Sequence, residues 1–311
     1  MSLFFFYSIT PSSRSKRFLL LSSVYIRFFD YILISIRYFI FIHSYDILII
    51  DNHNLILSLR DLIVIVFIMK FVIPSYQRVE LLKSKTLAFL KEQGVYPKDI
   101  YVFIRDDDSQ IDRYNAIPDI NVITLVGIKG IGNTHNAITT YFAEDEWITE
   151  LDDDIHHVID CKRNKISDFE TRIQKMVEIM QHECISYGGF YQCDNPMFMS
   201  GNQEYTTDLR YMLGLMRIRK IDYKIMLETN YSEDFENCIL HYIKDGSILK
   251  NNWIAGHTKN YNDGGCDGDG RDVETERIDK EFLANKYPNH CKIFQRKNGR
   301  WDLRLTKNPK S

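Results

Sequence analysis

Four short apolar runs, each followed by polar or glycine residues, are spaced along the first half of the chain beyond residue 69. They cover residues 70–73, 100–104, 120–126 and 147–151. Short apolar runs bounded in this way are typical of buried strands. Helical patterns follow the first run and the third. Strands alternating with helices predict an α/β fold with a mostly parallel central sheet flanked by helices.

The first predicted helix begins at Ser75, a residue type suited to an N-cap, and ends before Gly94. Its apolar positions recur at helical spacing along one face. They are Val79, Leu82, Thr86, Phe89 and Leu90.

The pattern changes after residue 154. Residues 167–170 form a capping-box pattern that opens one helix, and residues 232–236 open another that ends at Gly246. Residues 211–218 are the clearest strand pattern between these helices.

The C-terminal part contains a strong turn signal. Residues 293–305 have strand patterns on both sides of Asn298-Gly299. Asn-Gly between two such segments is typical of a two-residue hairpin turn, so a C-terminal β-hairpin is predicted.

Residues 1–68 differ in composition from residues 69–311. They contain no Gly, Ala, Glu, Gln, Trp or Cys, and charged residues interrupt every apolar stretch. No span of roughly 18 apolar residues remains, so a membrane anchor does not fit, and no small-residue cleavage site suggests a signal peptide. We expect residues 1–68 to be an atypical low-complexity apolar extension, either upstream sequence read from a misplaced start or a disordered tail. Function is then expected within residues 69–311.

Charge and cysteine content narrow the possible classes. The chain has 39 basic and 42 acidic residues, a net charge of −3 and six cysteines. No cysteine pair has C-x-x-C spacing, and no His/Cys cluster has zinc spacing. Free thiols in a reducing compartment are expected, which predicts a cytoplasmic location, or the host cytoplasm if the chain is viral.

Three consecutive acids end the fourth apolar run. Asp152, Asp153 and Asp154 lie where open α/β sheets bind ligands, at the carboxyl end of a strand. Alternation along the strand directs Asp152 and Asp154 to the same side. Because three adjacent carboxylates repel one another, Mn²⁺ or Mg²⁺ bridged to a substrate phosphate is the expected cofactor. A solvated acidic turn is the alternative.

Two other loops have two possible interpretations each. Residues 106–108, all aspartates, form either a solvated turn or a contact to a nucleotide base. Residues 127–132 depart from G-x-G-x-x-G and follow the third strand, so a Rossmann dinucleotide site is not expected. The glycines could still let the backbone approach a nucleotide, with His135 and Asn136 directed into the same cleft.

The second half offers an acid, a histidine and a glycine-rich loop. Asp234 either complements the dipole of its helix or acts as a general base. His257 is either a structural histidine or a metal ligand. Residues 263–271 are predicted to form a mobile lid over a bound nucleotide, because so much glycine cannot hold itself rigid. Its residues are Gly264, Gly265, Gly268, Gly270 and Arg271.

Several of these segments together resemble GT-A glycosyltransferases. Residues 71–78 (FVIPSYQR) resemble their opening strand, residues 130–136 (GIGNTHN) their glycine-rich turn, and residues 151–154 (LDDD) their D-x-D motif. Residues 232–236 (SEDFE) are similar to the acidic motif of inverting members, and His257 is placed like their late metal ligand. His135 departs from the pattern, because arginine is commoner there.

With the later glycine-rich loop and the terminal hairpin, residues 69–307 look most like the TET-associated glycosyltransferases. That family occurs in phages, viruses and some protists. It is inferred to attach sugars to hydroxymethylated pyrimidines in DNA. The resemblance implies a GT-A (nucleotide-diphospho-sugar transferase) fold and an acceptor in DNA.

The resemblance also implies residue roles. Asp154, His257 and Asp152 would hold the metal, with Asp152 also near the donor ribose, and Asp107 would contact the base. Asp234 would deprotonate the acceptor hydroxyl, with inversion at the anomeric carbon. A UDP-sugar is the expected donor. Further donor-binding positions are Pro74, Ser75, Arg78, Gly130, His135, Asn136 and Asp153.

More than one interpretation is open for the acceptor and for the reaction. Residues 286–311 carry eight basic residues against the single acid Asp302, interleaved with aromatics, which suits either nucleic-acid contact or a protected edge strand. Protein, lipid or glycan acceptors, a nucleotidyltransferase and a degenerate binding domain are the other possibilities.

Overall fold

The computed structural model describes residues 49–51, 54–56, 69–199, 203–258, 272–307 and 309. The chain divides into two units, Met1–Ile68 and Met69–Ser311. In the first unit, β1 (Ile49–Asp51) pairs in antiparallel fashion with β2 (Asn54–Ile56). Among the helices described, none has both the length and the apolar character needed to cross a membrane.

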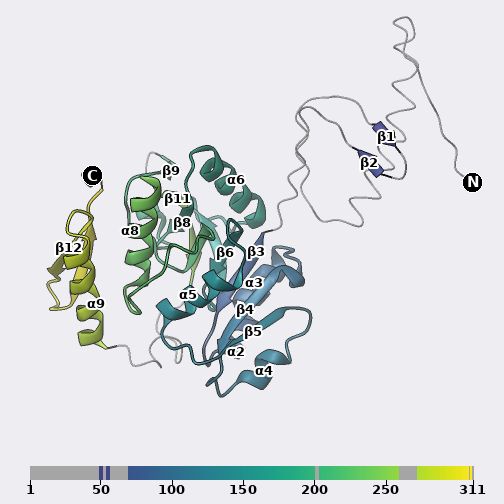
Figure 1. The fold of residues 1–311 in the computed structure, drawn as a ribbon, viewed down its shortest axis with the longest axis horizontal. Coiled ribbons are helices and arrows are strands. Elements are labelled where there is room, and N and C mark those ends of the chain that lie inside the picture. The colour runs from purple at the N-terminus through teal and green to yellow at the C-terminus, as the bar shows by residue number, and fades with distance from the viewer. Residues whose placement is uncertain are drawn as a thin grey trace, which may run out of the picture. The chain divides into compact units, whose positions relative to one another are not determined.

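A nine-stranded mixed sheet forms the centre of the second unit (Figure 1). Its order is β5-β4-β3-β6-β10-β8-β11-β7, with β9 paired to β11. The strands β5, β4, β3, β6, β8 and β11 run one way, and β10, β7 and β9 run the other. Their bounds are β3 Lys70–Pro74, β4 Ile100–Arg105, β5 Asn121–Leu125, β6 Trp147–Leu151, β7 His157–Asp160, β8 Tyr187–Tyr191, β9 Tyr205–Thr206, β10 Met216–Lys220 and β11 Leu249–His257.

The strand order reverses at β3. The chain proceeds outward from β3 to β4 and β5, and then returns to place β6 on the other side of β3. Both neighbours are parallel to β3, with Phe71 opposite Ile100 on one side and Thr149 on the other. In open α/β sheets, ligands bind at such a reversal, outside the carboxyl ends of the strands.

Strand β10 runs antiparallel between β6 and β8. Met216 lies opposite Leu151, and Lys220 lies opposite Trp147. The residues that precede β10 therefore lie beside the carboxyl end of β6.

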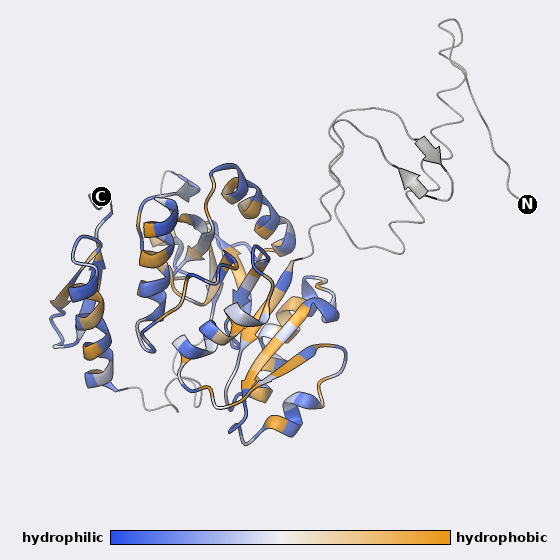
Figure 2. Ribbon diagram, viewed as in Figure 1, coloured by the Kyte–Doolittle hydropathy of each residue, from blue (hydrophilic) through white to orange (hydrophobic). Residues whose placement is uncertain are grey.

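Helices flank the sheet. The helix α5 covers the β3–β6 region through a core of Val72, Phe103, Leu125, Ile138, Phe142, Ile148 and Ile221. Figure 2 shows apolar residues concentrated in these strands and on the inner helix faces. The bounds are α2 Val79–Ser84, α3 Thr86–Glu92, α4 Ile111–Asn115, α5 Ile131–Tyr141, α6 Phe169–His182, α7 Pro196–Met199, α8 Glu233–Asp245 and α9 Val273–Lys286, with a 3₁₀ turn at Pro97–Asp99.

The C-terminal hairpin packs with α9 against α8 (Figure 1). Strand β12 (Cys291–Gln295) pairs with β13 (Trp301–Leu305) around the Asn298-Gly299 turn, as predicted. Ile239, Leu283 and Leu303 connect α8, α9 and β13 in one apolar cluster. The predicted α/β class, with helices flanking the sheet and a terminal hairpin, is confirmed.

The first predicted helix has the right buried face but a different start. All five apolar positions predicted for it are buried, and Gly94 adopts φ +78° after its end. However, the helix begins at Val79 and is interrupted at Lys85. Ser75 is not its N-cap, because its hydroxyl donates to Asp153 instead.

Two further boundaries were predicted wrongly. Helix α6 begins at Phe169 with Asp168 at the N-cap position. Asp168 makes no capping hydrogen bond and accepts from Arg172, whereas the Phe169 amide donates to the Gln93 side chain. The strand predicted at 211–218 is displaced to Met216–Lys220, and the residues before it form a loop beside Asp234.

Candidate active site

The acidic turn after β6 is held by residues from the first βα unit. The hydroxyl of Thr86 donates to the Asp152 carbonyl at 2.7 Å and accepts from the Ile155 amide at 2.9 Å. Because Thr86 is buried at the start of α3, the backbone of the turn is fixed without using any of its carboxylates.

Asp153 belongs to this support. A chain of hydrogen bonds runs from the Arg78 amide to the Tyr114 hydroxyl (2.9 Å), to the Ser75 hydroxyl (2.7 Å) and to Asp153 (2.6 Å). Asp153 is buried, and burial raises its pKa to about 6 despite the Ser75 hydrogen bond and the Arg78 charge. Its carboxylate therefore ties β6 to the end of β3, where Pro74 and Ser75 also lie.

Part of the Asp152 surface is exposed to solvent, but protein atoms and three other carboxylates lie close to its own carboxylate. The loss of surrounding water, and then repulsion from Asp154, Asp153 and Asp234, raise its pKa to about 8. The Asp154 Oδ1 atom is buried and has no hydrogen-bond partner among the described residues. A cation would relieve both features, because it neutralises the charge and satisfies the unpaired oxygen.

Asp234 lies in the first turn of α8, close to these acids. Its carboxylate accepts from the Tyr211 hydroxyl at 3.3 Å and lies 3.4 Å from the Arg217 guanidinium. A Cβ atom at Gly214 would lie 2.5 Å from Asp234 Oδ1, so only glycine leaves room for the carboxylate there. The pKa of Tyr211 is raised well above its usual value by burial and by Asp234, so Tyr211 remains a neutral donor.

A buried ionic network lies beneath Asp234. Glu150 on β6 accepts from Arg217 and from Arg219 on β10, the latter at 2.8 and 2.6 Å. All three side chains are at most 5% exposed. The two arginine charges hold the pKa of Glu150 well below its usual value, despite its burial. Arg217 thus connects the network to Asp234.

His135 and Asn136 are also committed to contacts within the protein. The ring of His135 is buried and accepts from Arg217, and burial together with that charge lowers its pKa, so the imidazole is neutral. Asn136 donates to the Leu227 carbonyl and accepts from its amide, both at 2.8 Å. Both side chains are thus held by contacts with β10 and with the loop at Leu227.

The glycine-rich turn before α5 approaches another loop closely. Gly130 is the N-cap of α5, with φ +82°. A Cβ atom at Gly132 would lie 1.9 Å from the Thr229 carbonyl oxygen, so a side chain there would collide with backbone. These glycines allow α5 to pack against residues 229–230.

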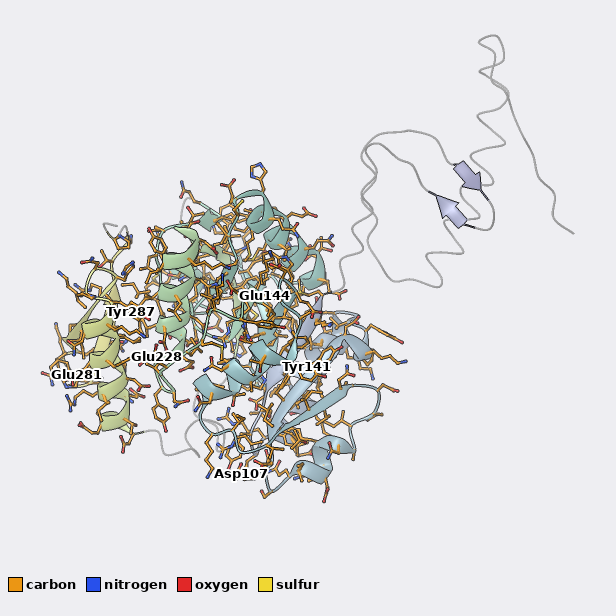
Figure 3. The ribbon with its side chains drawn as sticks, in the orientation of Figure 1. Asp107, Tyr141, Glu144, Glu228, Glu281 and Tyr287 are labelled. Atoms are coloured by element: carbon orange, nitrogen blue, oxygen red, sulfur yellow. The ribbon has the colours of Figure 1, made fainter. Side chains whose placement is uncertain are left out.

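Each of the three aspartates after β4 has its own hydrogen-bond partners. Asp106 accepts from the Gly127 amide, and Asp108 accepts from the Gln77 and Gln110 amides. Asp107 is exposed at the end of β4 (Figure 3) and accepts two hydrogen bonds from Arg105, which lower its pKa. Arg105 also lies under the Tyr76 ring, 4.2 Å from its centroid.

The predicted metal ligand His257 has other neighbours. Its ring forms a hydrogen bond with the Asp194 carboxylate and stacks on His157 at a centroid distance of 4.6 Å. Within the described residues, no three His, Cys, Asp or Glu side chains converge as a metal site. The metal-ligand role of Asp152, Asp154 and His257 thus stays a prediction. The predicted lid, Gly264 to Arg271, lies outside the described residues.

Sequence reasoning missed Glu150, Arg217, Arg219 and Tyr211. A signal was present for the arginines: they alternate with apolar residues in residues 216–220, so they share one face of a strand. Two buried arginines on one face require a buried acid opposite them. Glu150, within the run 147–151, was the candidate.

No protein-family model matches the chain, and no curated protein matches it in sequence. Structures of distant proteins do match. TarS from S. aureus (residues 1–349) has 15% identity and a TM-score of 0.42 over 70% of this chain and 65% of its own. The mannosyltransferase PcManGT from Pyrobaculum calidifontis, in complex with GDP-Man and Mn²⁺, has 12% identity and a TM-score of 0.42 over 59% and 56%.

Glucosyl-3-phosphoglycerate synthase from Mycobacterium tuberculosis, in complex with Mn²⁺, UDP and phosphoglyceric acid, matches over more of its length. It has 10% identity and a TM-score of 0.42 over 77% of this chain and 86% of its own. The present chain spans less than two thirds of the TarS and PcManGT chains. At these values the matches assign no residue, so the roles below rest on the geometry of this chain.

Proposed function

We propose that residues 69–311 form a GT-A glycosyltransferase domain that transfers a sugar from a nucleoside-diphosphate donor to an acceptor hydroxyl. One observation carries the proposal. Asp152 and Asp154, the latter with an unsatisfied buried oxygen, follow β6 at the strand-order reversal, and the charge of Asp152 interacts with that of Asp234. This arrangement combines a site for a cation and diphosphate with a carboxylate suited to a base.

The residues present fit a divalent cation, Mn²⁺ or Mg²⁺. Such ions are commonly held by one or two carboxylates, with water and substrate phosphates completing the shell, so the two aspartates suffice. Asp152 and Asp154 would hold the ion, and His257 remains a predicted third ligand. When bound, the ion supplies positive charge that stabilises the departing nucleoside diphosphate.

Asp234 is the proposed general base. It takes the proton of the acceptor hydroxyl while the acceptor oxygen bonds to the anomeric carbon. The bond from that carbon to the diphosphate oxygen breaks, its electron pair leaves with the diphosphate, and the configuration inverts. Arg217 and Tyr211 act on Asp234 as positioning residues, because each contacts its carboxylate.

The donor is proposed to lie over the ends of β3, β4 and β6. Pro74, Arg78 and Asp107 border this region, and the Tyr76–Arg105 pair beside Asp107 offers a flat surface for a base. A UDP-sugar is the proposed donor.

A hydroxymethylpyrimidine in DNA is the proposed acceptor, in a cytoplasmic setting. The basic residues of the terminal hairpin support it, as does the likeness of the sequence to TET-associated glycosyltransferases. A base in a duplex would first have to be flipped out of the stack.

The test is turnover of a panel of UDP-sugars by the full chain in Mn²⁺, with hydroxymethylated DNA and with protein or lipid acceptors. We expect Asp154→Ala to reduce turnover to below about one hundredth, because charge stabilisation at the leaving group is lost. Asp112→Ala removes an exposed acid of α4 and is the matched control. Unchanged turnover in Asp154→Ala would rule out the metal-binding role.

A further inference from the structure

A cavity of about 400 Å³ lies between the C-terminal hairpin and the main sheet. Five basic side chains line it: Arg210, Lys250, Arg296, Arg304 and Lys307. Asp302 is the single acidic residue in its wall. These cations come from three separate parts of the chain, so the fold, and not a local run of charge, brings them together.

Lys250 is the most informative member. Lys250 lies at the start of β11 and is only 4% exposed. Its ammonium group donates to Gln192 and to the Tyr211 carbonyl and lies 4.9 Å from the Tyr191 ring centroid. Within the described residues no carboxylate lies within 4 Å of it. A buried cation with only neutral partners is costly, and an anion in the cavity would compensate it.

The hairpin contributes cations that are also incompletely neutralised. Arg304 stacks on Phe294 at 4.9 Å, and neither Arg304 nor Lys307 has a carboxylate within 4 Å among the residues the structure describes. Arg210 pairs with Asp208, and Arg296 pairs with Asp302. Positive charge therefore predominates in the cavity.

The cavity adjoins the proposed base. Tyr211 and Phe235 line it, with their rings stacked at 4.3 Å. The Tyr211 hydroxyl donates to Asp234, and Phe235 is the next residue after Asp234. A molecule in this cavity would thus lie one side chain away from the carboxylate that accepts the proton.

We infer that this cavity binds a phosphate group of the acceptor and so directs its hydroxyl toward Asp234. The inference rests on the proposed glycosyl transfer. Phosphate suits the site because it presents several charged oxygens, which arginines bind in a fixed geometry and lysines bind as point charges. The phosphate comes either from a small phosphorylated acceptor or from the backbone of a nucleic acid.

Binding is to be measured on the full chain without nucleotide sugar. The probes are fluorescein-labelled single-stranded hexanucleotide DNA, the same sequence with an uncharged methylphosphonate backbone, and glycerol 3-phosphate as direct ligand and competitor. We expect Lys250→Met and Arg304→Gln each to weaken binding of the charged probe roughly tenfold, the effect of losing one charged hydrogen bond. Lys297→Gln, on the turn of the same hairpin but outside the cavity, should change it less than about twofold.

The probes separate the two sources of phosphate. Binding of the charged hexanucleotide but not of its methylphosphonate form indicates a nucleic-acid backbone, whereas binding of glycerol 3-phosphate alone indicates a small phosphorylated acceptor. Absence of binding by both charged probes, or an equal loss in Lys297→Gln, would overturn the inference. If Lys250→Met strongly lowers the melting temperature, its loss of binding could come from unfolding. The inference is then judged on probe binding by the exposed Arg304→Gln variant.

The test of the phosphate site gives a result that can be distinguished from the test of glycosyl transfer. UDP binding in Mn²⁺ should be unchanged in the cavity variants. A chain that binds phosphate in the cavity but turns over no nucleotide sugar would refute the transferase assignment and leave the phosphate site standing.

Discussion

Replacing Glu150 with glutamine tests the buried network on which the candidate site rests. Glu150→Gln keeps the shape of the side chain but removes the charge that Arg217 and Arg219 share. Among the described residues, Arg219 has no other acid within 4 Å, whereas Arg217 also lies 3.4 Å from Asp234. The variant therefore leaves a buried positive charge uncompensated.

The expected loss of unfolding free energy is about 3–5 kcal/mol, the range found when one partner of a buried ion pair is removed. Glutamine also replaces one of the two accepting oxygens with an NH2 group, a donor that would face a guanidinium donor. At least one of the three charge-assisted hydrogen bonds is therefore lost, at roughly 1.5–3 kcal/mol. Urea denaturation at pH 7, followed by tryptophan fluorescence, measures this loss. Because the pKa of Glu150 is depressed in the folded state, its stabilisation is present above pH 4 to 5 and disappears as the pH falls through the folded value.

Glu80 provides the matched control. It also contacts two cations, Lys83 at 3.5 Å and Arg113 at 2.8 Å, but its side chain is 66% exposed. Glu80→Gln should cost at most about 1 kcal/mol, because water screens exposed pairs. If Glu150→Gln lowers the free energy of unfolding by no more than Glu80→Gln does, the burial of the network does not strengthen its contribution to stability.

Two further outcomes are expected. Asp234→Asn should retain donor binding but reduce turnover about 10²-fold or more, because the base is lost; an equal loss of donor affinity, measured by titration with UDP, would instead favour a helix-dipole role for Asp234. His241 is buried beside Ser186, and burial, with Arg219 and Lys244 nearby, lowers its pKa to about 3. Between pH 6.5 and 4 the unfolded chain takes up a proton that the folded one does not, so stability should fall by about 1.4 kcal/mol per pH unit for this residue. His241→Asn should remove that share of the slope in urea titrations, and a constant difference from wild type across this range would contradict the assignment.

Local pattern was sufficient to predict the strands that form the site. The apolar runs 70–73, 100–104 and 147–151 are β3, β4 and β6. Aspartates follow β4 and β6 directly, whereas Pro74 and Ser75 end β3. The relation holds because a strand buried on both faces is mostly apolar, and a run of polar residues marks where it reaches solvent. Glu150 departs from this pattern because Arg217 and Arg219 neutralise its charge. The position of the acidic turn at the carboxyl end of β6 could therefore be predicted.

The exact pairing of residues distant in sequence could not be predicted, although the alternating arginines of residues 216–220 indicated that a buried acid would face them. Ser75 has a side chain suited to an N-cap, but its hydroxyl donates to Asp153 instead. The parallel pairing of β3 and β6 brings these two residues together. Likewise, Glu150 meets Arg217 because of the antiparallel register between β6 and β10. A register is set by the whole sheet, so no local pattern contains it.

The reversed direction of β10 has a geometric consequence for the chemistry. The strand is five residues long, so its two ends lie roughly 16 Å apart. Had it run with its neighbours, the loop that carries Tyr211 and Gly214 would enter from the opposite rim, and the phenol could not reach Asp234. The polarity of this one strand thus decides whether the loop before it can bring Tyr211 and Gly214 beside Asp234.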